Sequence, residues 1–358
     1  MKIIEPPKTI IENPDSLFGY FAWPTVARLQ DGTLATTCSG FRLAHVCPFG
    51  KAVISYSRDE GKNWTNAMPV IDTPLDDRDS GILVAGDKVI VTSFNNNAKL
   101  QRRYFGWEFG CRDERQTLAD AYLNCIPTSL EEQYLGSTYV ISRDGGYTFG
   151  EIKKSPVTSP HGPCVTPDGR ILWVGRLFDA DDKPTAVACC ELNDNDEFVK
   201  IAELPTFSDE YGTGDACEPY AVCFPDGRIL VASRVERSGE HSLFTVATCE
   251  STDGGKTFTK FKRIIGEDDG APPHLMIHSS GKLILVYACR AEGRRGIRVR
   301  ISEDGGRSFG EEYRLSEDSE TLDLGYPASV ERNDGSILTV YYEHIGNRSV
   351  IKQTVWEL

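Results

Sequence analysis

The chain has 358 residues, of which 40% are hydrophobic, and a formal net charge of −14 at pH 7. The hydrophobic fraction is enough for a normal core, and the negative charge argues against nucleic acid as a partner, because phosphate binding needs a basic face. The sequence has neither an apolar signal core after Met1 nor an apolar run long enough to cross a membrane, so we expect a cytoplasmic protein with no membrane contact.

A turn followed by an apolar strand recurs along the whole chain. These turns begin at six positions: Asp31, Gly86, Asp168, Asp226, Ser280 and Asp334. The steps between them are 55, 82, 58, 54 and 54 residues, so one unit is enlarged. About 50 residues with four strands make one blade of a β-propeller, and a closed ring of blades leaves no exposed sheet edge. We therefore predict an all-β fold, a six-bladed β-propeller with four-stranded antiparallel blades, which spans residues 1–358 as a single domain.

A second motif, Ser-x-Asp-x-Gly-x-x-aromatic, supports the repeat. Its four copies begin at Ser57, Ser142, Ser251 and Ser302. In such a turn the Asp side chain bonds to nearby backbone amides, the Gly takes a positive φ angle and the aromatic ring packs beneath. In three units the motif follows the first turn by 22 to 26 residues, which leaves room for the second and third strands of a blade.

The enlarged unit carries an insertion at about 98–135, within the second blade. The stretch 113–125 fits a short helix with Leu118, Tyr122 and Cys125 on one stripe. Long loops between strands often shape binding sites, and the alternative is a surface excursion that packs on the rim.

Eleven cysteines are present, an odd number without the spacing of a metal site. Cys189 and Cys190 are adjacent in an expected strand and point to opposite faces, and others lie in apolar strands, where a reduced thiol behaves as a small hydrophobic group. We expect reduced thiols, no metal and no cofactor.

The entry ends of the innermost strands open onto one mouth of a propeller's central tunnel, where pockets gather. Counting eight residues back from each turn gives Trp23, Arg78, Pro160, Glu218, Pro272 and Tyr326. The next positions include Asp79 and His161, which could line the same mouth. Glu218 and Tyr326 lie two blades apart at the same expected height, so we predict that their side chains converge.

Three arginines follow the turns at corresponding places. Arg176 and Arg234 come eight residues after a turn and Arg290 comes ten after. Arginine suits bidentate capture of a carboxylate, although each one could instead be the structural partner of an acidic residue. Their similar heights favour a binding role.

The sequence resembles the sialidase superfamily over its full length. The Ser-x-Asp-x-Gly-x-x-aromatic turns correspond to the Asp boxes of that family, and the segments 218–234 and 325–343 look like its fourth and sixth blades. The resemblance implies that Tyr326 is the nucleophile and Glu218 the base that takes its proton. It also implies that Arg234 and Arg290, or the pair Arg294 and Arg295, hold the carboxylate of a sugar.

Two parts of the family pattern are missing. Blade one of a sialidase carries Phe-Arg-Ile-Pro, whereas this chain has Phe21-Ala22-Trp23-Pro24, without the first clamp arginine. No aspartate stands between Ser39 and Ser57, where sialidases place their acid/base. His45 or Asp79 would then supply the proton, Arg78 or Arg42 would replace the lost arginine, and Trp23 could offer a face for a sugar to stack on.

The resemblance therefore implies an exo-glycoside hydrolase that acts on a terminal acidic sugar of a glycan. Two alternatives stay open at this point. The first is a hydrolase or lyase directed at a uronic acid; for the elimination, Tyr and His could serve as base and acid. The second is a glycan-binding propeller without catalysis, because a fold does not fix a function.

Overall fold

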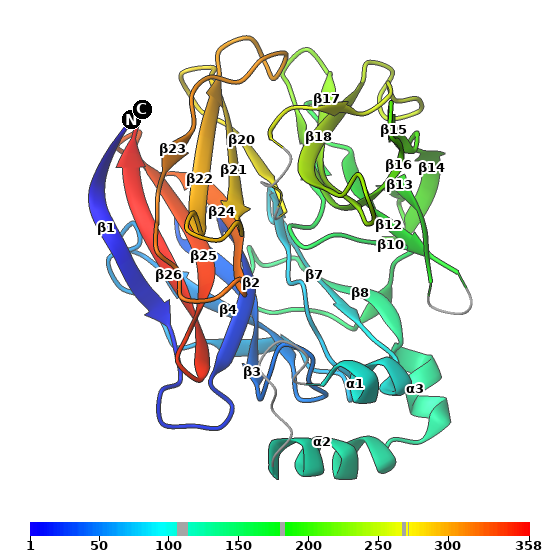
Figure 1. Ribbon diagram of the computed structural model, residues 1–358. Coiled ribbons are helices and arrows are strands. Elements are labelled where there is room, and N and C mark those ends of the chain that lie inside the picture. Colours follow the sequence, from blue (N-terminus) through cyan, green and yellow to red (C-terminus); the bar gives the residue numbers. More distant parts are fainter. Residues whose placement is uncertain (106–113, 180–182, 267–269, 271) are drawn as a thin grey trace.

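The computed structural model describes residues 1–105, 114–179, 183–266, 270 and 272–358 (Figure 1). The strands in these ranges fall into five hydrogen-bonded sheets, which surround a central axis as in a propeller. The expectation of an all-β, propeller-like fold with antiparallel sheets is confirmed. No helix in the described ranges is long and apolar enough to cross a membrane.

The largest sheet joins the two ends of the chain. Its eight strands are β24 (Leu324–Glu331), β25 (Ile337–Ile345), β26 (Arg348–Glu357), β2 (Tyr20–Arg28), β3 (Leu34–Arg42), β4 (Lys51–Ser57) and β5 (Met68–Ile71), with β1 (Lys2–Ile11) on the other edge of β26. β1 is antiparallel to β26, and Lys2 pairs with Glu357. β2 and β26 are parallel and share the single pair Tyr20 and Ser349. The two termini therefore lie side by side (Figure 1).

The other sheets follow the chain as antiparallel meanders. The first contains β6 (Ile82–Ala85), β7 (Lys88–Asn95), β8 (Gly136–Ser142) and β9 (Lys153–Lys154). The second contains β10 (Val157–Thr158) and β11 (Cys164–Val165), which both pair with β12 (Ile171–Phe178), then β13 (Pro184–Leu192) and β14 (Phe198–Glu203). The third runs through β15 (Phe207–Asp209), β16 (Gly212–Cys223), β17 (Ile229–Arg237), β18 (Leu243–Ser251) and β19 (Lys262–Arg263). The fourth is β20 (His274–Ile277), β21 (Leu283–Cys289), β22 (Gly296–Ser302) and β23 (Tyr313–Arg314).

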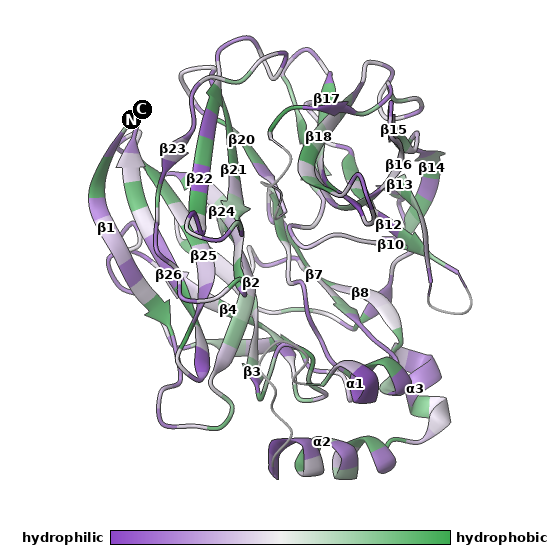
Figure 2. Cartoon of the chain, in the orientation of Figure 1, coloured by the Kyte–Doolittle hydropathy of each residue, from purple (hydrophilic) through white to green (hydrophobic). Residues whose placement is uncertain are grey.

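Hydrophobic residues of neighbouring sheets pack against one another and form the core. β22 alternates between hydrophobic and hydrophilic residues along its length (Figure 2). Its Ile297 and Val299 are fully buried and pack in one cluster with Tyr341 and Trp356 of β25 and β26. This alternation is what a strand needs when its two faces meet different surroundings.

Each Asp box closes a turn with the same set of bonds. In the first copy the Ser57 hydroxyl donates to Asp59 at 2.9 Å and accepts from the amide of Gly61 at 2.9 Å. The Asp59 carboxylate also accepts from the amide of Asn63 at 2.9 Å. Gly61 has a φ angle of 84°, which explains why the motif requires glycine there.

The described residues between β7 and β8 include three helices: α1 (Ala98–Tyr104), α2 (Glu114–Asn124) and α3 (Thr128–Tyr134). The expected stripe on α2 is correct at Tyr122, whose ring contacts that of Phe49 and whose hydroxyl donates to the carbonyl oxygen of Pro74 at 3.2 Å, and it is wrong at the other two expected positions. The buried residues of α2 are Ala119 and Leu123, whereas Leu118 is 44% exposed and Cys125 lies beyond the helix end and is exposed. The helix therefore packs through Ala119 and Leu123 in addition to Tyr122. Residue 113, the expected start, lies outside the described ranges.

Candidate functional site

Four residues, in the strands β2, β16 and β24 and just before β6, share an uncommon backbone conformation. Trp23, Asp79, Glu218 and Tyr326 have φ angles of 55°, 54°, 52° and 49°. In β2, β16 and β24 the register of the strand pairing shifts at these residues. A positive φ is uncommon for residues other than glycine, and such strain concentrates at functional sites. These irregular positions bring the four side chains close together.

In the second unit the residue with this conformation is Asp79, whereas the count from the turn predicted Arg78. The turn between β6 and β7 is short, with Ala85 paired to Lys88. A count of eight residues back from Gly86 therefore goes one residue past Asp79, the position that corresponds to Glu218 and Tyr326. Arg78 forms the preceding backbone bridge with Phe94 instead.

Tyr326 and Glu218 converge, as predicted. The Tyr326 hydroxyl donates a hydrogen bond to Oε1 of Glu218. The other carboxylate oxygen, Oε2, accepts from Nη1 of Arg234 at 2.8 Å. Arg234 forms a second ion pair with Glu236. Tyr326 is 6% exposed, so the phenol meets its carboxylate in a largely buried place.

Burial and charge give the two partners different protonation states. Burial raises the pKa of Tyr326 well above its ordinary value, and the nearby carboxylates Glu218 and Asp79 raise it further. Burial also acts to raise the pKa of Glu218, but Arg234 and the hydrogen bond from Tyr326 outweigh this effect and lower it. At neutral pH the phenol therefore keeps its proton and the carboxylate is ready to accept it.

A cavity of about 240 Å³ opens beside this pair. It is lined by charged, apolar and hydroxyl-bearing residues from three successive sheets: Asp79, Phe94, Thr158, Ser159, Pro160, Arg176, Phe178, Asp215, Cys217, Glu218, Arg234 and Glu236. The buried Oδ1 of Asp79 has no hydrogen-bond partner among the described residues. Burial raises the pKa of Asp79 to about 6, although Arg78, with Nε at 4.0 Å, acts to lower it. Asp79 can therefore hold or release a proton close to neutral pH.

The indole of Trp23 is fully buried. The guanidinium of Arg78 lies 4.3 Å from its centroid, and that of Arg42 lies 4.8 Å away. Arg42 is itself wholly buried and forms an ion pair with Asp76 at 2.5 Å. The structure therefore gives no support to Trp23 as an exposed sugar-stacking face or to Arg42 as a group that reaches a substrate.

Asp323, which the sequence did not single out, is the centre of a buried cluster next to Trp23. Its Oδ2 accepts from the Tyr20 hydroxyl at 2.6 Å, and its Oδ1 accepts from the Tyr342 hydroxyl at 2.7 Å. Nδ1 of His45 lies 3.1 Å from Oδ1 of Asp323 and 2.9 Å from the Tyr20 hydroxyl. Burial acts to raise the pKa of Asp323, but its partners, His45 first among them, lower it to about 2.

One signal in the sequence could have found this cluster. Tyr20 and Asp323 each stand three residues before a positive-φ residue, Trp23 and Tyr326 respectively. Examining the residue three positions before the positive-φ residue in every unit would have predicted that Tyr20 and Asp323 lie at the same height in the ring.

Arg176 and Arg290 both lie near the buried pair. Arg176 lines the cavity and forms an ion pair with Asp215. Nη2 of Arg290 donates to the carbonyl oxygen of Leu324 at 3.1 Å, and its guanidinium lies 6.0 Å from the ring centroid of Tyr326.

His161 does not line the cavity. It is fully buried, with Nδ1 3.1 Å from the Thr25 hydroxyl, and its ring contacts those of Tyr220 and His274. Burial lowers the pKa of His161 to about 3, so the ring is neutral. The structure gives no support to the expectation that His161 binds a substrate at the mouth.

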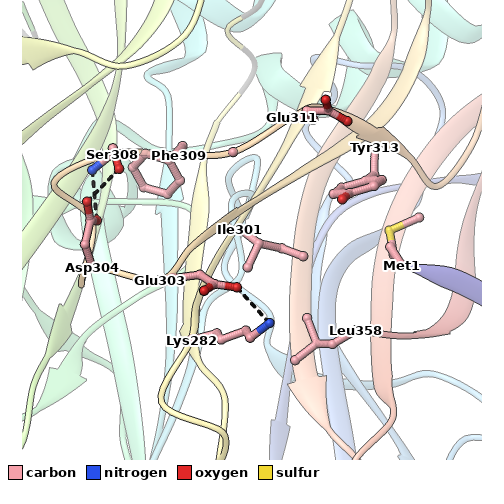
Figure 3. Close-up of a pocket in the computed structure, with 11 residues that line it drawn as sticks. Met1, Lys282, Ile301, Glu303, Asp304, Ser308, Phe309, Glu311, Tyr313 and Leu358 are labelled. Carbon is pink, nitrogen blue, oxygen red and sulfur yellow. Dashed lines mark hydrogen bonds and ion pairs between the residues drawn. The ribbon is translucent and has the colours of Figure 1, made fainter.

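A larger pocket, about 470 Å³, lies elsewhere, where the two termini meet the Asp box of β22 (Figure 3). Lys282 and Glu303 form an ion pair in its wall at 2.9 Å, and Asp304 binds Ser308 in the Asp-box turn. None of the converging residues described above lines this larger pocket. We therefore choose the smaller cavity as the candidate site because of its reactive side chains and not because of its volume. Among the described residues, no group of three or more His, Cys, Asp and Glu side chains could hold a metal ion.

Comparison with known proteins identifies a family that matches more than half of the chain. A family described as a BNR repeat-like domain matches residues 122–339. None of the curated proteins compared with the chain matches it.

Solved structures share the fold at low sequence identity. A protein of unknown function from Dyadobacter fermentans has a TM-score of 0.77 and 20% identity, and the match covers 100% of this chain and 99% of that one. The intramolecular trans-sialidase from Ruminococcus gnavus has a TM-score of 0.68 and 14% identity, with 98% and 97% covered. The Hadza microbial sialidase Hz136 has a TM-score of 0.69 and 16% identity, with 98% and 68% covered. These similarities establish a shared fold.

Proposed function

Since this chain belongs to the BNR repeat-like domain family, we propose that it is an exo-glycoside hydrolase that removes a terminal acidic sugar from a glycan. One observation carries the proposal: a buried phenol, Tyr326, donates to the carboxylate of Glu218, and Glu218 lines a cavity. Two proteins with the same fold are described as a sialidase and a trans-sialidase, which supports a sugar as the substrate.

In the proposed reaction the Tyr326 oxygen attacks the anomeric carbon while the bond from that carbon to the leaving oxygen breaks. Glu218 accepts the phenolic proton, which turns a weak nucleophile into an effective one. Water then displaces Tyr326 from the anomeric carbon, and the proton returns from Glu218 to the phenol. A nucleophile that starts neutral suits a sugar with a carboxylate at the anomeric carbon, because a negative nucleophile would be repelled.

Asp79 protonates the leaving oxygen in this proposal. It lines the same cavity as Glu218, and its raised pKa of about 6 keeps part of the population protonated near neutral pH. In the second step the Asp79 carboxylate accepts a proton from the attacking water. His45, the other donor that the sequence suggested, has Nδ1 directed at Asp323 and Tyr20, which favours a different role.

Three arginines anchor the substrate carboxylate in this proposal: Arg234, Arg290 and Arg78. Arg234 and Arg290 flank the reacting pair, as their contacts with Glu218 and with the ring of Tyr326 indicate. Arg78 takes the place of the arginine that blade one lacks, and Arg42 supports it indirectly, because both arginines approach the carboxylate of Asp76.

We also propose that the ring has six blades of four strands and forms one domain over residues 1–358. The eight-stranded sheet is then two blades, β2 to β5 and β24 to β26 with β1, which touch at the single pair Tyr20 and Ser349. The segment 98–135 is an insertion in the blade made by β6 to β9. We propose a cytoplasmic location, which the reduced, buried thiols of Cys38, Cys47 and Cys190 support.

A panel of fluorogenic glycosides tests the proposed function. It contains sialic acid, uronic acid and neutral sugars on one leaving group, and turnover is expected for at least one acidic member. A fluorinated acidic sugar that slows the second step should leave a covalent adduct on Tyr326, which mass spectrometry of peptides would locate.

The other outcomes identify the alternatives. A product that absorbs in the ultraviolet from a uronic acid substrate indicates elimination instead of hydrolysis. Binding of acidic sugars by calorimetry without turnover of any substrate indicates a glycan-binding propeller. Turnover of neutral glycosides only would contradict the acidic-sugar assignment.

A further inference from the structure

A chain of polar contacts runs from Asp323 through His45 to Arg78. Nδ1 of His45 lies 3.1 Å from Oδ1 of Asp323, and Nε2 on the other side of the ring lies 3.4 Å from Nη2 of Arg78. The side chains of the three residues are 0%, 15% and 11% exposed, so solvent screens this chain of contacts weakly.

The contacts define which ring nitrogen of His45 carries the proton. A guanidinium has only donors, so Nε2 must accept from Arg78 and Nδ1 must carry the hydrogen. The Tyr20 hydroxyl already donates to Oδ2 of Asp323 at 2.6 Å. Nδ1 of His45 can therefore donate to the Tyr20 oxygen and to Oδ1 of Asp323. The opposite tautomer would set an N–H of His45 against the N–H of Arg78 and leave Asp323 without that donor.

The guanidinium of Arg78 is held on further sides. It lies over Trp23 at 4.3 Å, approaches Oδ2 of Asp76 at 3.6 Å and donates to the carbonyl oxygen of His45 at 3.5 Å. A cation fixed in this way loses little conformational freedom when an anion binds, and this preorganisation increases affinity. His45 contributes only while its Nε2 is an acceptor.

We infer that Asp323 is a positioning residue for the anion-binding arginine Arg78, which it orients by fixing the tautomer of His45. The inference rests on the proposed function, because it assigns Arg78 to the substrate carboxylate. It explains how the site works without the first clamp arginine: a buried carboxylate, an imidazole and an indole hold a cation from the neighbouring blade in its place. Asp323 itself touches no substrate.

The tautomer can be measured without any substrate. Long-range ¹H–¹⁵N spectra of the wild-type protein should show His45 with a protonated Nδ1 and an unprotonated Nε2, and the His45→Gln variant assigns its signals among the six histidines. In Asp323→Asn the amide can donate to Nδ1, so the tautomer should reverse. Tyr342→Phe is the matched control, because it removes another bond to Asp323 Oδ1, at 2.7 Å, and leaves His45 in place.

Selectivity for charge reports the effect on Arg78. The quantity is the ratio of kcat/KM for an acidic glycoside to that for the same sugar with its carboxylate reduced to an alcohol. We expect Arg78→Ala and Asp323→Asn each to lower this ratio about tenfold, as the loss of one charge-assisted contact would. The double variant should lower it no further, because both changes remove the same interaction, and Tyr342→Phe should leave the ratio unchanged.

Three results would overturn the inference: a wild-type His45 protonated at Nε2, a tautomer that Asp323→Asn does not change, or additive effects of Asp323→Asn and Arg78→Ala. If Asp323→Asn does not fold, the wild-type spectrum still shows which nitrogen of His45 is protonated. Tyr20→Phe, which removes the other partner of Nδ1, then replaces Asp323→Asn in the comparison with Arg78→Ala. Absence of turnover on every glycoside would refute the proposed function, whereas the spectra would still test the positioning of Arg78.

Discussion

At residue 326 one oxygen atom carries the proposed chemistry. We predict that Tyr326→Phe lowers kcat by at least about a thousandfold, because the remaining ring cannot form a bond to the anomeric carbon. Stability should change by only about 1 kcal/mol, since a single hydrogen bond is lost and Arg234 still pairs with Glu218. Steady-state kinetics and thermal unfolding measure both. Tyr342→Phe is the control for the loss of a buried phenol, and full activity of Tyr326→Phe would rule out the covalent mechanism.

Asp79 should set the alkaline limit of activity. Because burial raises its pKa from 3.8 to about 6, the acid form is depleted as the pH rises through 6, and kcat/KM should fall there. In Asp79→Asn the fall of kcat/KM on the alkaline side of the pH profile should disappear, together with most of the activity on glycosides with poor leaving groups. More activity should remain on a dinitrophenyl glycoside, because its leaving group needs no acid. An unchanged pH profile in the variant would assign the acid to another group.

The same residue affects stability with a definite sign. The folded state holds the Asp79 proton more tightly than the unfolded chain, so stability falls as the pH rises from about 3.8 to about 6 and is constant above that. The free energy of unfolding is therefore lower at pH 7 than at pH 4 by up to about 3 kcal/mol, because each unit of pKa shift corresponds to about 1.4 kcal/mol. Denaturant unfolding at both pH values should show that the wild type loses more stability between pH 4 and pH 7 than Asp79→Asn does, by up to this amount.

Sequence alone located part of the site because part of it is periodic. Glu218, Tyr326 and Trp23 occupy equivalent places in their units, so a fixed count from a turn found them. The count failed by one residue at Asp79, where a short turn changes the spacing. It could not find Asp323, whose partners Tyr20, His45 and Tyr342 come from distant parts of the sequence and meet only when the ring closes.

Among the elements, the Asp boxes show how a short motif stabilises a turn. The backbone amide of Asn63 and the neighbouring hydrogen bonds lower the pKa of Asp59 from 3.8 to about 2. The stability that this carboxylate contributes is therefore complete above about pH 4 and is lost as the pH falls towards 2.

We predict that Asp59→Asn lowers the melting temperature at pH 7 and that the difference from the wild type shrinks as the pH approaches 2. Differential scanning calorimetry across this range measures it. Asp15→Asn is the matched control, because Asp15 is an exposed aspartate outside the Asp boxes. A difference that stays constant with pH would assign the effect to the side chain's shape instead of its charge.

The helices mark the limit of pattern reading at this scale. Residues 114–124 do form a helix, but its buried face consists of Ala119 and Leu123. A stripe of large residues is a weak guide in a short helix, because the surface that it meets decides which face is buried.

At the scale of the whole molecule, β1 is the outermost strand of the sheet in which the two chain ends meet. It pairs with β26 along most of its length, and Lys2 pairs with Glu357. We predict that removing residues 1–11 lowers the melting temperature by more than about 5 °C, because β26 then exposes an unpaired edge. Light scattering should show association through this edge.

A circular permutant tests the same feature in the opposite direction. A short linker between residues 358 and 1, with new ends at the exposed turn around Gly239, should preserve both the fold and the kinetics. Loss of folding in the permutant, with normal behaviour of the truncated chain, would show that the adjacency of the ends contributes nothing to stability.

The four positive-φ residues Trp23, Asp79, Glu218 and Tyr326 allow the chemistry of the site to change while the backbone stays the same. The same backbone conformation presents an indole, two carboxyl groups and a phenol at equivalent positions of four units. The main chain therefore determines where each group lies, and the side chain determines its chemistry. A substitution at such a place can deliver a new functional group to the centre without a new scaffold. Trp23, Asp79, Glu218 and Tyr326 are four such places in this chain.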